Sequence, residues 1–334
     1  MAAKTAGAAE VRPASEGTVD GLASYVGEFA ATPGPLSKPL ADLLATYSGI
    51  PRDAQAAHIV RVRDEAYARF PYPCLGTFRF LDLDLAAHFG YAEHVLAPLL
   101  APRAVGAEEE EEEGEGPLFL DLGTCFGQDL RRLAHDGVAA ARLWASDIEP
   151  ELVELGFRLF GDAGRLGRGR FLCPGDLLAA ADDAGDRLRE LDGRVTILHA
   201  TAVFHLFSLD EQRRAADRCL RLLRRDPARP ALVIGAQVGS LTPGPFSRRN
   251  LSGNYIHKYR HDARTWRDLW RDAAAAPPWR DLVARVDVES RLLRRVHGQD
   301  ADGDAVTTFV DADADTPIVW QMFEVWVTFA EQPK

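Results

Sequence analysis

The chain has 334 residues, of which 46% are hydrophobic and 9% aromatic, enough apolar material for a large core and about two domains' worth of mass. Its formal net charge of −11 argues against binding to nucleic acid or to an anionic membrane surface through bulk charge. Four widely spaced cysteines without a CxxC pair do not suggest a disulfide scaffold or a cysteine-ligated metal. The N-terminus lacks the apolar stretch of a signal peptide, and no apolar run approaches the roughly 20 residues of a membrane span. We therefore expect a cytoplasmic protein without membrane insertion.

Three segments precede the strand-like part of the chain. Residues 1–34 are rich in Ala, Gly, Pro, Ser and Thr and predict a poorly ordered lead-in. Residues 35–105 predict a helical cap or lid, because apolar side chains recur every three to four residues, as from Leu40 to Tyr47. The glutamate run within 106–116 is flanked by glycines and is typical of a solvated acidic loop.

Residues 117–330 alternate short apolar runs with helical segments, the pattern of a doubly wound, Rossmann-like parallel sheet of the α/β class. Two later runs, LVARVDVES (282–290) and IVWQMFEVWVTFA (318–330), predict an antiparallel pair at the sheet edge. A parallel sheet closed by such a pair favours a class I methyltransferase fold over a dinucleotide dehydrogenase. The five runs that predict parallel strands are LFLDLG (118–123), RLWASDI (142–148), RFLCPGDLL (170–178), VTILHATAVFHLF (195–207) and ALVIGAQVG (231–239).

The first strand ends in a glycine turn that runs straight into a helix, which is where open α/β sheets bind ligands. The turn offers Gly123 and Gly127 with Thr124 between them, but it lacks the further glycines of a G-x-G-x-x-G dinucleotide turn. Asp121 would repel a pyrophosphate and suits a ligand that carries an ammonium and a sulfonium. The turn therefore favours S-adenosylmethionine as cofactor. The plainer alternative is a helix-start turn with a solvated aspartate.

Two more acids follow neighbouring strands. Asp147 ends the second strand at the interval where such folds present a carboxylate to ribose hydroxyls, and Ile148 lies beside it. Asp176 ends the third strand, where its side chain or the backbone of Leu177 would meet the adenine edge. Either acid alone is equally well explained as a cap. Three acids at three consecutive strand ends are harder to attribute to capping.

Several segments carry a family resemblance in their order and spacing. They are YPCLGTFRFLDL (72–83), FLDLGTCFGQDLRRL (119–133), ASDIEPELVELGFRLF (145–160), LHATAVFHLFSLDEQ (198–212), GAQVG (235–239) and Tyr259-Arg260-His261. Together they resemble the class I S-adenosylmethionine-dependent methyltransferases of fungal secondary metabolism, including those of meroterpenoid pathways. The resemblance covers about residues 67–329. The glutamate run and the Asp-rich stretch at 300–315 look like insertions relative to that pattern.

The resemblance implies a biosynthetic enzyme that methylates a small molecule. Its acceptor would be a carboxyl or hydroxyl group of a terpenoid or polyketide-derived product, and a homodimer is one assembly that the resemblance allows. The cofactor residues that it implies are Asp121, Gly123, Asp147, Ile148, Asp176, Leu177, Ala200 and Thr201.

The acceptor decides whether the enzyme needs a base. Methyl transfer from a sulfonium is an in-line displacement in which alignment is the main task. A hydroxyl benefits from proton removal, whereas a carboxylic acid, with a pKa of about 4, is already anionic at neutral pH. His205, just after the fourth strand, is the candidate base, and the alternative is a packing histidine ahead of the helix cap at Ser208. His199, inside the strand, is expected to be structural.

Arg79 lies among aromatic residues in the break between the N-terminal helices. One interpretation is a lid in which its guanidinium holds a carboxylate of the donor or of an acidic acceptor. The alternative is a surface arginine stacked on a phenylalanine. Further candidates for the acceptor pocket are Tyr72, Gln237 and Tyr259.

Two patterns imitate metal sites. His257 and His261 are four residues apart, a spacing compatible with one helical face, but no carboxylate partner is indicated and a loop lining the acceptor pocket is the expected alternative. The aspartates at 300–311 have calcium-loop spacing, yet Ala305 stands where such a loop needs glycine, so a solvated hairpin loop is expected. We therefore expect no metal.

The residues and the resemblance together predict an O-methyltransferase that uses S-adenosylmethionine and a small, largely apolar acceptor. An NAD(P)-dependent oxidoreductase is the enzymatic alternative, although Asp121 and the missing glycines are adverse to it. A catalytically silent protein that binds the cofactor and serves a partner is the other alternative.

Overall fold

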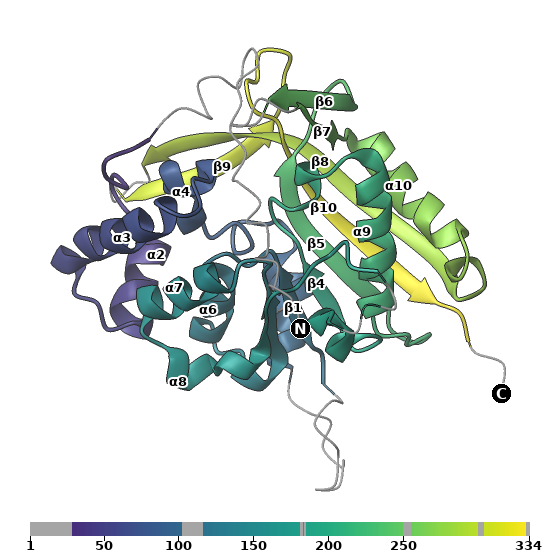
Figure 1. Ribbon diagram of the computed structural model, residues 1–334, viewed down its shortest axis with the longest axis horizontal. Helices are drawn as coiled ribbons and strands as arrows, with labels where there is room; N and C mark the ends of the chain where they lie inside the picture. Colours follow the sequence, from purple (N-terminus) through teal and green to yellow (C-terminus); the bar gives the residue numbers. More distant parts are fainter. Residues whose placement is uncertain are drawn as a thin grey trace, which may run out of the picture.

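The computed structural model describes residues 29–101, 116–180, 183, 185–249, 255–299 and 304–331 (Figure 1). The lead-in expected over 1–34 and the acidic loop expected over 106–116 lie outside this range, apart from residues 29–34 and 116. Within these ranges, no helix combines the length and the apolar character that crossing a bilayer requires.

An eight-stranded sheet in the order β3-β2-β1-β4-β5-β10-β8-β9 forms the centre of the molecule. Its five parallel strands confirm the prediction, but each is shorter than its apolar run, the third and fourth most of all. The third ends before Pro174, which lacks the N–H that a ladder needs, and the fourth ends at His199, ahead of Ala202 with φ +60°. Asp176 therefore lies in a turn beyond its strand. The parallel strands are β1 (Phe119–Leu122), β2 (Leu143–Ser146), β3 (Phe171–Leu172), β4 (Ile197–His199) and β5 (Ala231–Val238).

Three antiparallel strands extend the sheet. They are β8 (Val283–Gln299), β9 (Ala305–Asp311) and β10 (Trp320–Phe329). The predicted pair is confirmed as β8 and β10, with β10 lying between β5 and β8. The expectation of a solvated hairpin loop over 300–311 is wrong for residues 305–311, which form β9, because the sequence AVTTFVD is rich in the β-branched residues that favour strands.

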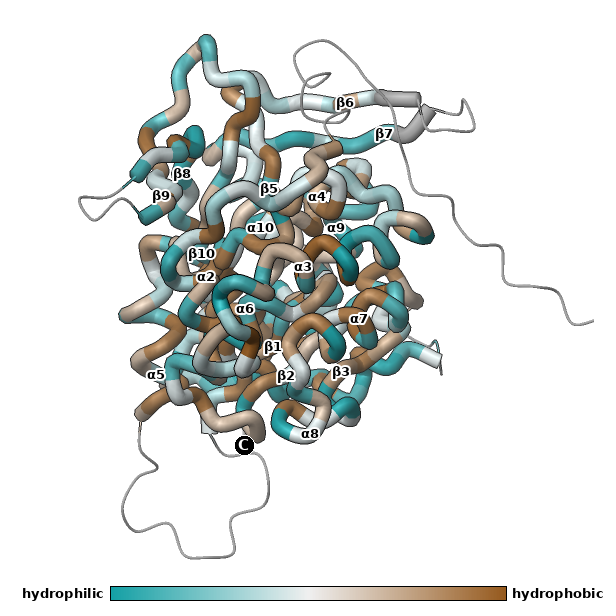
Figure 2. The backbone as a smooth tube through the Cα atoms, turned by 90° about the vertical axis from the view of Figure 1, so that its left-hand side faces the viewer, coloured by the Kyte–Doolittle hydropathy of each residue, from teal (hydrophilic) through white to brown (hydrophobic). Residues whose placement is uncertain are grey.

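Successive residues of β1 point to opposite faces, and both faces are apolar. Leu120 and Leu122 share a core with α9 (Leu209–Leu222) and α10 (Ala263–Ala275), whereas Phe119 packs with α6 (Gln128–His135) and α7 (Pro150–Phe160). Helices thus cover both faces of the sheet (Figure 1). The helices around the sheet alternate between hydrophobic and hydrophilic residues, as elements with one buried face do (Figure 2).

The N-terminal helical segment, residues 29–101, packs on α7 and on the turn after β1. Leu43, Ile59 and Leu75 share one core with Leu155 of α7. Phe80 meets Phe126 of the turn edge-on, with ring centroids 4.8 Å apart. The segment therefore lies against the glycine turn. Its elements are α2 (Lys38–Asp42), η1 (Leu43–Tyr47), α3 (Arg52–Tyr67), α4 (Pro73–Gly76), η2 (Arg79–Leu81), η3 (Tyr91–Leu96) and α5 (Ala97–Leu100).

A separate hairpin of β6 (Gly244–Arg249) and β7 (Tyr255–Arg260) precedes α10. His257 belongs to β7 and His261 follows that strand, so the two histidines do not share a helical face. Among the described residues, no group of three or more His, Cys, Asp or Glu side chains is placed to hold a metal ion. Short turns complete the chain: η4 (Ala140–Arg142), α8 (Ala163–Leu166), η5 (Arg168–Arg170), η6 (Arg187–Leu191), η7 (Phe204–Leu206) and η8 (Trp279–Asp281).

Candidate functional site

The turn between β1 and α6 has left-handed backbone at three positions. Gly123, Cys125 and Gly127 have φ values of +66°, +52° and +69°, a region that favours glycine. A Cβ added at Gly123 would also lie 2.7 Å from a methyl group of Val203, in the loop after β4. The glycine therefore permits both the turn and the close approach of the two loops at the carboxyl end of the sheet.

Asp121 is buried, with 3% of its surface exposed, and the protein engages both of its carboxylate oxygens. Oδ2 accepts from the Thr124 hydroxyl at 2.6 Å, and Oδ1 lies 2.7 Å from Nδ1 of His199. Burial alone would lower the pKa of His199, but the Asp121 carboxylate outweighs it and the pKa is raised. The charge of Asp121 is thus shared with a histidine from β4.

Asp147, directly after β2, holds the glycine turn in place. Its Oδ2 accepts from the backbone N–H of Cys125 at 2.7 Å, and Oδ1 accepts from that of Glu149 at 3.0 Å. Burial raises the pKa of Asp147 to about 6. A carboxylate offers about four lone-pair directions, so these two bonds leave room for further donors. Ile148, beside it, is 46% exposed.

The loop after β3 brings Asp176 to the same edge of the sheet. Gly175 donates its N–H to the carbonyl oxygen of Asp147 at 2.8 Å, which ties this loop to the end of β2. Asp176 is exposed and accepts from the N–H of Leu178 at 2.8 Å, whereas Leu177 is buried. The acids after β2 and β3 are therefore neighbours, as the parallel topology predicts.

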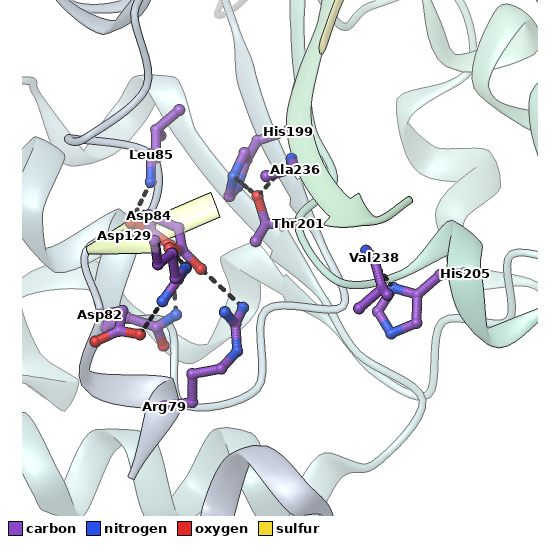
Figure 3. A network of polar contacts seen from close by, with 12 residues as sticks. Arg79, Asp82, Asp84, Leu85, Asp129, His199, Thr201, His205, Ala236 and Val238 are labelled. Atoms are coloured by element: carbon purple, nitrogen blue, oxygen red, sulfur yellow. Dashed lines mark hydrogen bonds and ion pairs between the residues drawn. The ribbon is translucent and has the colours of Figure 1, made fainter. Parts of the chain in front are cut away.

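The chain leaves β4 through Ala200 and Thr201. Ala200 is buried against β5, where a Cβ added at Gly235 would lie 2.2 Å from the Ala200 carbonyl oxygen. Thr201 is half-buried, and its hydroxyl contacts Nε2 of His199 at 2.8 Å and the N–H of Ala236 at 3.2 Å (Figure 3). This hydroxyl therefore links the ends of β4 and β5.

His205 lies in η7 and is half-buried. Its Nδ1 accepts from the backbone N–H of Val238 at 3.4 Å, and Figure 3 shows these two residues apart from His199 and Thr201. Because Nδ1 is the acceptor, the hydrogen of the neutral ring is on Nε2. Whether His205 serves as a base therefore depends on the state of Nε2.

Arg79 connects the N-terminal helical segment to the antiparallel strands. Its guanidinium donates to Asp84 at 3.0 Å (Figure 3). It also lies 3.9 Å from the ring centroid of Trp320 in β10. Arg295 of β8 binds the same Asp84, and its guanidinium lies 4.7 Å from the same ring. Arg79 thus stacks on a tryptophan where the sequence suggested a phenylalanine.

The other expected pocket residues lie on different elements. Burial, followed by the charges of Glu149 and Asp147, raises the pKa of Tyr72, which places this residue near the acid after β2. Gln237 is buried at the end of β5 and donates to Gln321 at 2.8 Å. Tyr259, in β7, is tied by its backbone N–H to the loop ahead of α9.

Asp129 is a buried acid that the sequence analysis missed. Its carboxylate accepts from the N–H of Leu85 at 3.2 Å and so joins α6 to the N-terminal helical segment. Burial raises the pKa of Asp129 to about 7. An acid in the first turn of a helix is ordinarily explained by a favourable interaction with the helix dipole. The sequence alone therefore gives no sign that Asp129 is buried.

Comparison with known proteins finds methyltransferases among the relatives of this chain. The model of the meroterpenoid methyltransferase N-terminal domain matches residues 30–81. The O-methyltransferase phiE of Fungal sp. is 34% identical over 239 residues, which cover 71% of each chain. The Asnovolin E/Chermesin D methyltransferase nvfJ of Aspergillus novofumigatus is also 34% identical, over 71% of this chain and 76% of that one. Methyltransferase trt5 of Aspergillus terreus is 31% identical over 78% of this chain and 84% of its own length. The chain belongs to the class I S-adenosylmethionine-dependent methyltransferases of fungal secondary metabolism, of the meroterpenoid type.

Proposed function

We propose that this chain transfers a methyl group from S-adenosylmethionine to a carboxyl oxygen of a small, largely apolar natural product. Oxygen as the accepting atom is supported by two relatives, phiE and atr3, that are named O-methyltransferases. The carboxyl group is supported by the hydrogen bond from Val238 to Nδ1 of His205. A homodimer and a cytoplasmic location stay predictions, as do the domain boundaries.

The residues at the strand ends suit this donor. Asp147 keeps lone-pair directions for the two ribose hydroxyls, and the bare backbone at Gly123 leaves space in the turn. When bound, the donor supplies an electrophilic methyl group on a sulfonium. The residues that would hold it are Asp121, Gly123, Thr124, Gly127, Asp147, Ile148, Asp176, Leu177, Ala200 and Thr201.

The tautomer of His205 bears on the acceptor. A hydroxyl acceptor would have to lose its proton, and a ring whose Nδ1 lone pair accepts from Val238 presents a hydrogen at Nε2. A carboxylate has already lost its proton at neutral pH, and its oxygen can accept a hydrogen bond from Nε2. His205 would then orient the anion without removing a proton.

Apolar side chains near the same strand ends support an apolar acceptor. Leu206 follows His205 in η7 and is 47% exposed, and Leu241, in the loop after β5, is 43% exposed. Both are beyond the carboxyl ends of parallel strands, where open α/β sheets bind ligands. An acceptor that covers them would remove apolar surface from water.

Matched pairs of acids and alcohols test the proposed acceptor. Purified protein and isotope-labelled S-adenosylmethionine are incubated with abietic acid and abietol, and with farnesoic acid and farnesol. We expect methyl esters of the acids and no ethers of the alcohols, detected by mass spectrometry. Ethers without esters would contradict the carboxyl assignment. Intact binding of S-adenosylhomocysteine without any product from either class would support the catalytically silent alternative.

Alanine at position 205 separates orientation from base catalysis. If His205 donates to a carboxylate, His205→Ala raises the KM for the acid about tenfold, because a hydrogen bond to a charged group is lost, and kcat stays nearly constant. If His205 is a base, kcat falls about a hundredfold or more and its pH profile loses a limb. His257→Ala, at an exposed histidine in β7, is the matched control.

A further inference from the structure

One chain of hydrogen bonds runs across β1, β4 and β5. Asp121 Oδ1 lies 2.7 Å from His199 Nδ1, His199 Nε2 lies 2.8 Å from the Thr201 hydroxyl, and that hydroxyl accepts from the N–H of Ala236 at 3.2 Å. Figure 3 shows His199 and Thr201 meeting beside Ala236. The chain begins at a buried acid and ends at a half-buried hydroxyl, so it connects the interior to the carboxyl edge of the sheet.

The charges around His199 favour a proton on both ring nitrogens. Asp121 of β1, Asp129 of α6 and Asp84 of the N-terminal helical segment all act to raise its pKa. Burial acts in the opposite direction, and nearby His88, whose pKa burial lowers to about 3, carries no charge at neutral pH. The acids prevail, and the pKa of His199 lies above its ordinary value.

We propose that protonated His199 is a positioning residue that turns the hydroxyl hydrogen of Thr201 toward the carboxylate of the bound donor's amino-acid end. With both ring nitrogens protonated, Nε2–H donates to Thr201. The hydroxyl oxygen then accepts two hydrogen bonds, from His199 and from Ala236, and its own hydrogen is left to donate. A neutral ring would instead take that hydrogen, and Thr201 would present a lone pair, which repels a carboxylate.

The position of Thr201 points to the donor, and the inference rests on the donor site proposed above. The loop that carries Thr201 also carries Val203, which fills the space over Gly123 of the glycine turn. The donor ends in an ammonium and a carboxylate, and the carboxylate would be repelled by the negative charge of Asp121. Imidazolium at His199 balances that charge, and the Thr201 hydroxyl gives the carboxylate a hydrogen-bond partner.

The protonation state can be measured directly on the unmodified protein. Nitrogen NMR of protein labelled with ¹⁵N-histidine, with the His199 signals assigned by their absence in His199→Asn, reports how many ring nitrogens carry hydrogen. We expect two at pH 6.5. A singly protonated ring at that pH would overturn the proposal.

Calorimetry of two ligands tests the role of the hydroxyl. S-adenosylhomocysteine carries the carboxylate, whereas its decarboxylated analogue S-adenosyl-3-thiopropylamine keeps only the amine. We expect Thr201→Val to weaken binding of the first about tenfold and of the second less than about twofold. Thr201→Ser, which retains the hydroxyl, should bind both ligands like the unmodified protein. Equal losses for the two ligands, or no loss, would overturn the proposal.

The pH dependence of binding gives a readout that a purely structural role would not change. As pH rises through the pKa of His199, the unmodified protein should lose affinity for S-adenosylhomocysteine, and Thr201→Val should lack this part of the decline. Asp129 and Asp147 titrate in both proteins and cancel in the comparison. If Thr201→Val does not fold, the ligand affinities of Thr201→Ser and the NMR measurement of His199 still test the proposal. Failure of the unmodified protein to bind S-adenosylhomocysteine would contradict the donor site itself, whereas normal binding that Thr201→Val leaves unchanged would contradict only this inference.

Discussion

Alanine at position 147 is expected to weaken binding of S-adenosylhomocysteine about a hundredfold, measured by calorimetry at pH 7. The substitution removes the carboxylate proposed to accept from the ribose hydroxyls. It also leaves the N–H groups of Cys125 and Glu149 without their acceptor, so the turn that shapes the site loses its support. Both effects act on the ligand-binding edge.

Asp176→Ala is the matched control for this substitution. Asp176 is an exposed acid after the neighbouring strand, and its carboxylate accepts from the N–H of Leu178 but not from the glycine turn. Its loss should weaken binding by less than about tenfold. Similar losses for the two variants would contradict the distinct role of Asp147.

The pKa of Asp147, about 6, gives a second test of its role in donor binding. Protonation at lower pH removes the charge that strengthens hydrogen bonds from the ribose, so affinity should fall as pH decreases through about 6. Asp147→Asn should lack this dependence.

Methionine at position 131 is expected to lower the free energy of unfolding by about 3–5 kcal/mol, measured by urea denaturation. Arg131 donates to both oxygens of Asp162, at 2.8 and 2.9 Å, and neither side chain has any exposed surface. Removing the guanidinium leaves the Asp162 carboxylate buried with the Tyr47 hydroxyl at 2.7 Å. The free energy of unfolding falls because the Asp162 carboxylate then remains buried without a compensating positive charge.

Two comparisons make this prediction specific. Arg158→Met breaks an exposed pair with Glu65 and should barely change the denaturation midpoint. The double variant Arg131→Met/Asp162→Asn, which removes both charges, should recover much of the lost stability. An Arg131→Met protein as stable as Arg158→Met would contradict the assignment of a buried ion pair.

Arg131 also belongs to the support of the site. Its guanidinium donates to the carbonyl oxygens of Phe126 and Gly127 at 3.1 and 3.4 Å. Arg131 of the buried ion pair therefore also fixes the backbone of the glycine turn. Donor binding by Arg131→Met should weaken at temperatures where the variant is still folded.

The acids at strand ends could be predicted from the sequence because their placement follows from local pattern and topology. Asp121, Asp147 and Asp176 each lie near the carboxyl end of an apolar run, and parallel strands bring such ends to one edge. The glycine turn is equally local. These features need only the period of the strand and the direction of the sheet.

Contacts between residues far apart in the sequence could not be predicted, because they do not follow from local pattern. His199 and Asp121 are 78 positions apart, and their contact depends on β1 and β4 being neighbours in register. A histidine within an apolar strand indicates burial, but it does not identify its partner. The bond from Leu85 to Asp129 likewise depends on how the N-terminal helical segment lies over α6.

The end of β3 and the presence of β9 were predicted wrongly, each for a physical reason. The third apolar run continues past Leu172, yet Pro174 cannot join the ladder. The aspartates on either side of AVTTFVD favoured a loop in the prediction, although the β-branched residues of this segment form β9 and pair with β8.

Titration of the purified chain with S-adenosylhomocysteine, followed by isothermal calorimetry at pH 7, tests most directly that the ends of β1, β2 and β4 bind the methyl donor. The account predicts one molecule bound per chain with a micromolar dissociation constant, and no comparable binding of NADH. Absence of binding by S-adenosylhomocysteine, or tighter binding of NADH, would contradict it.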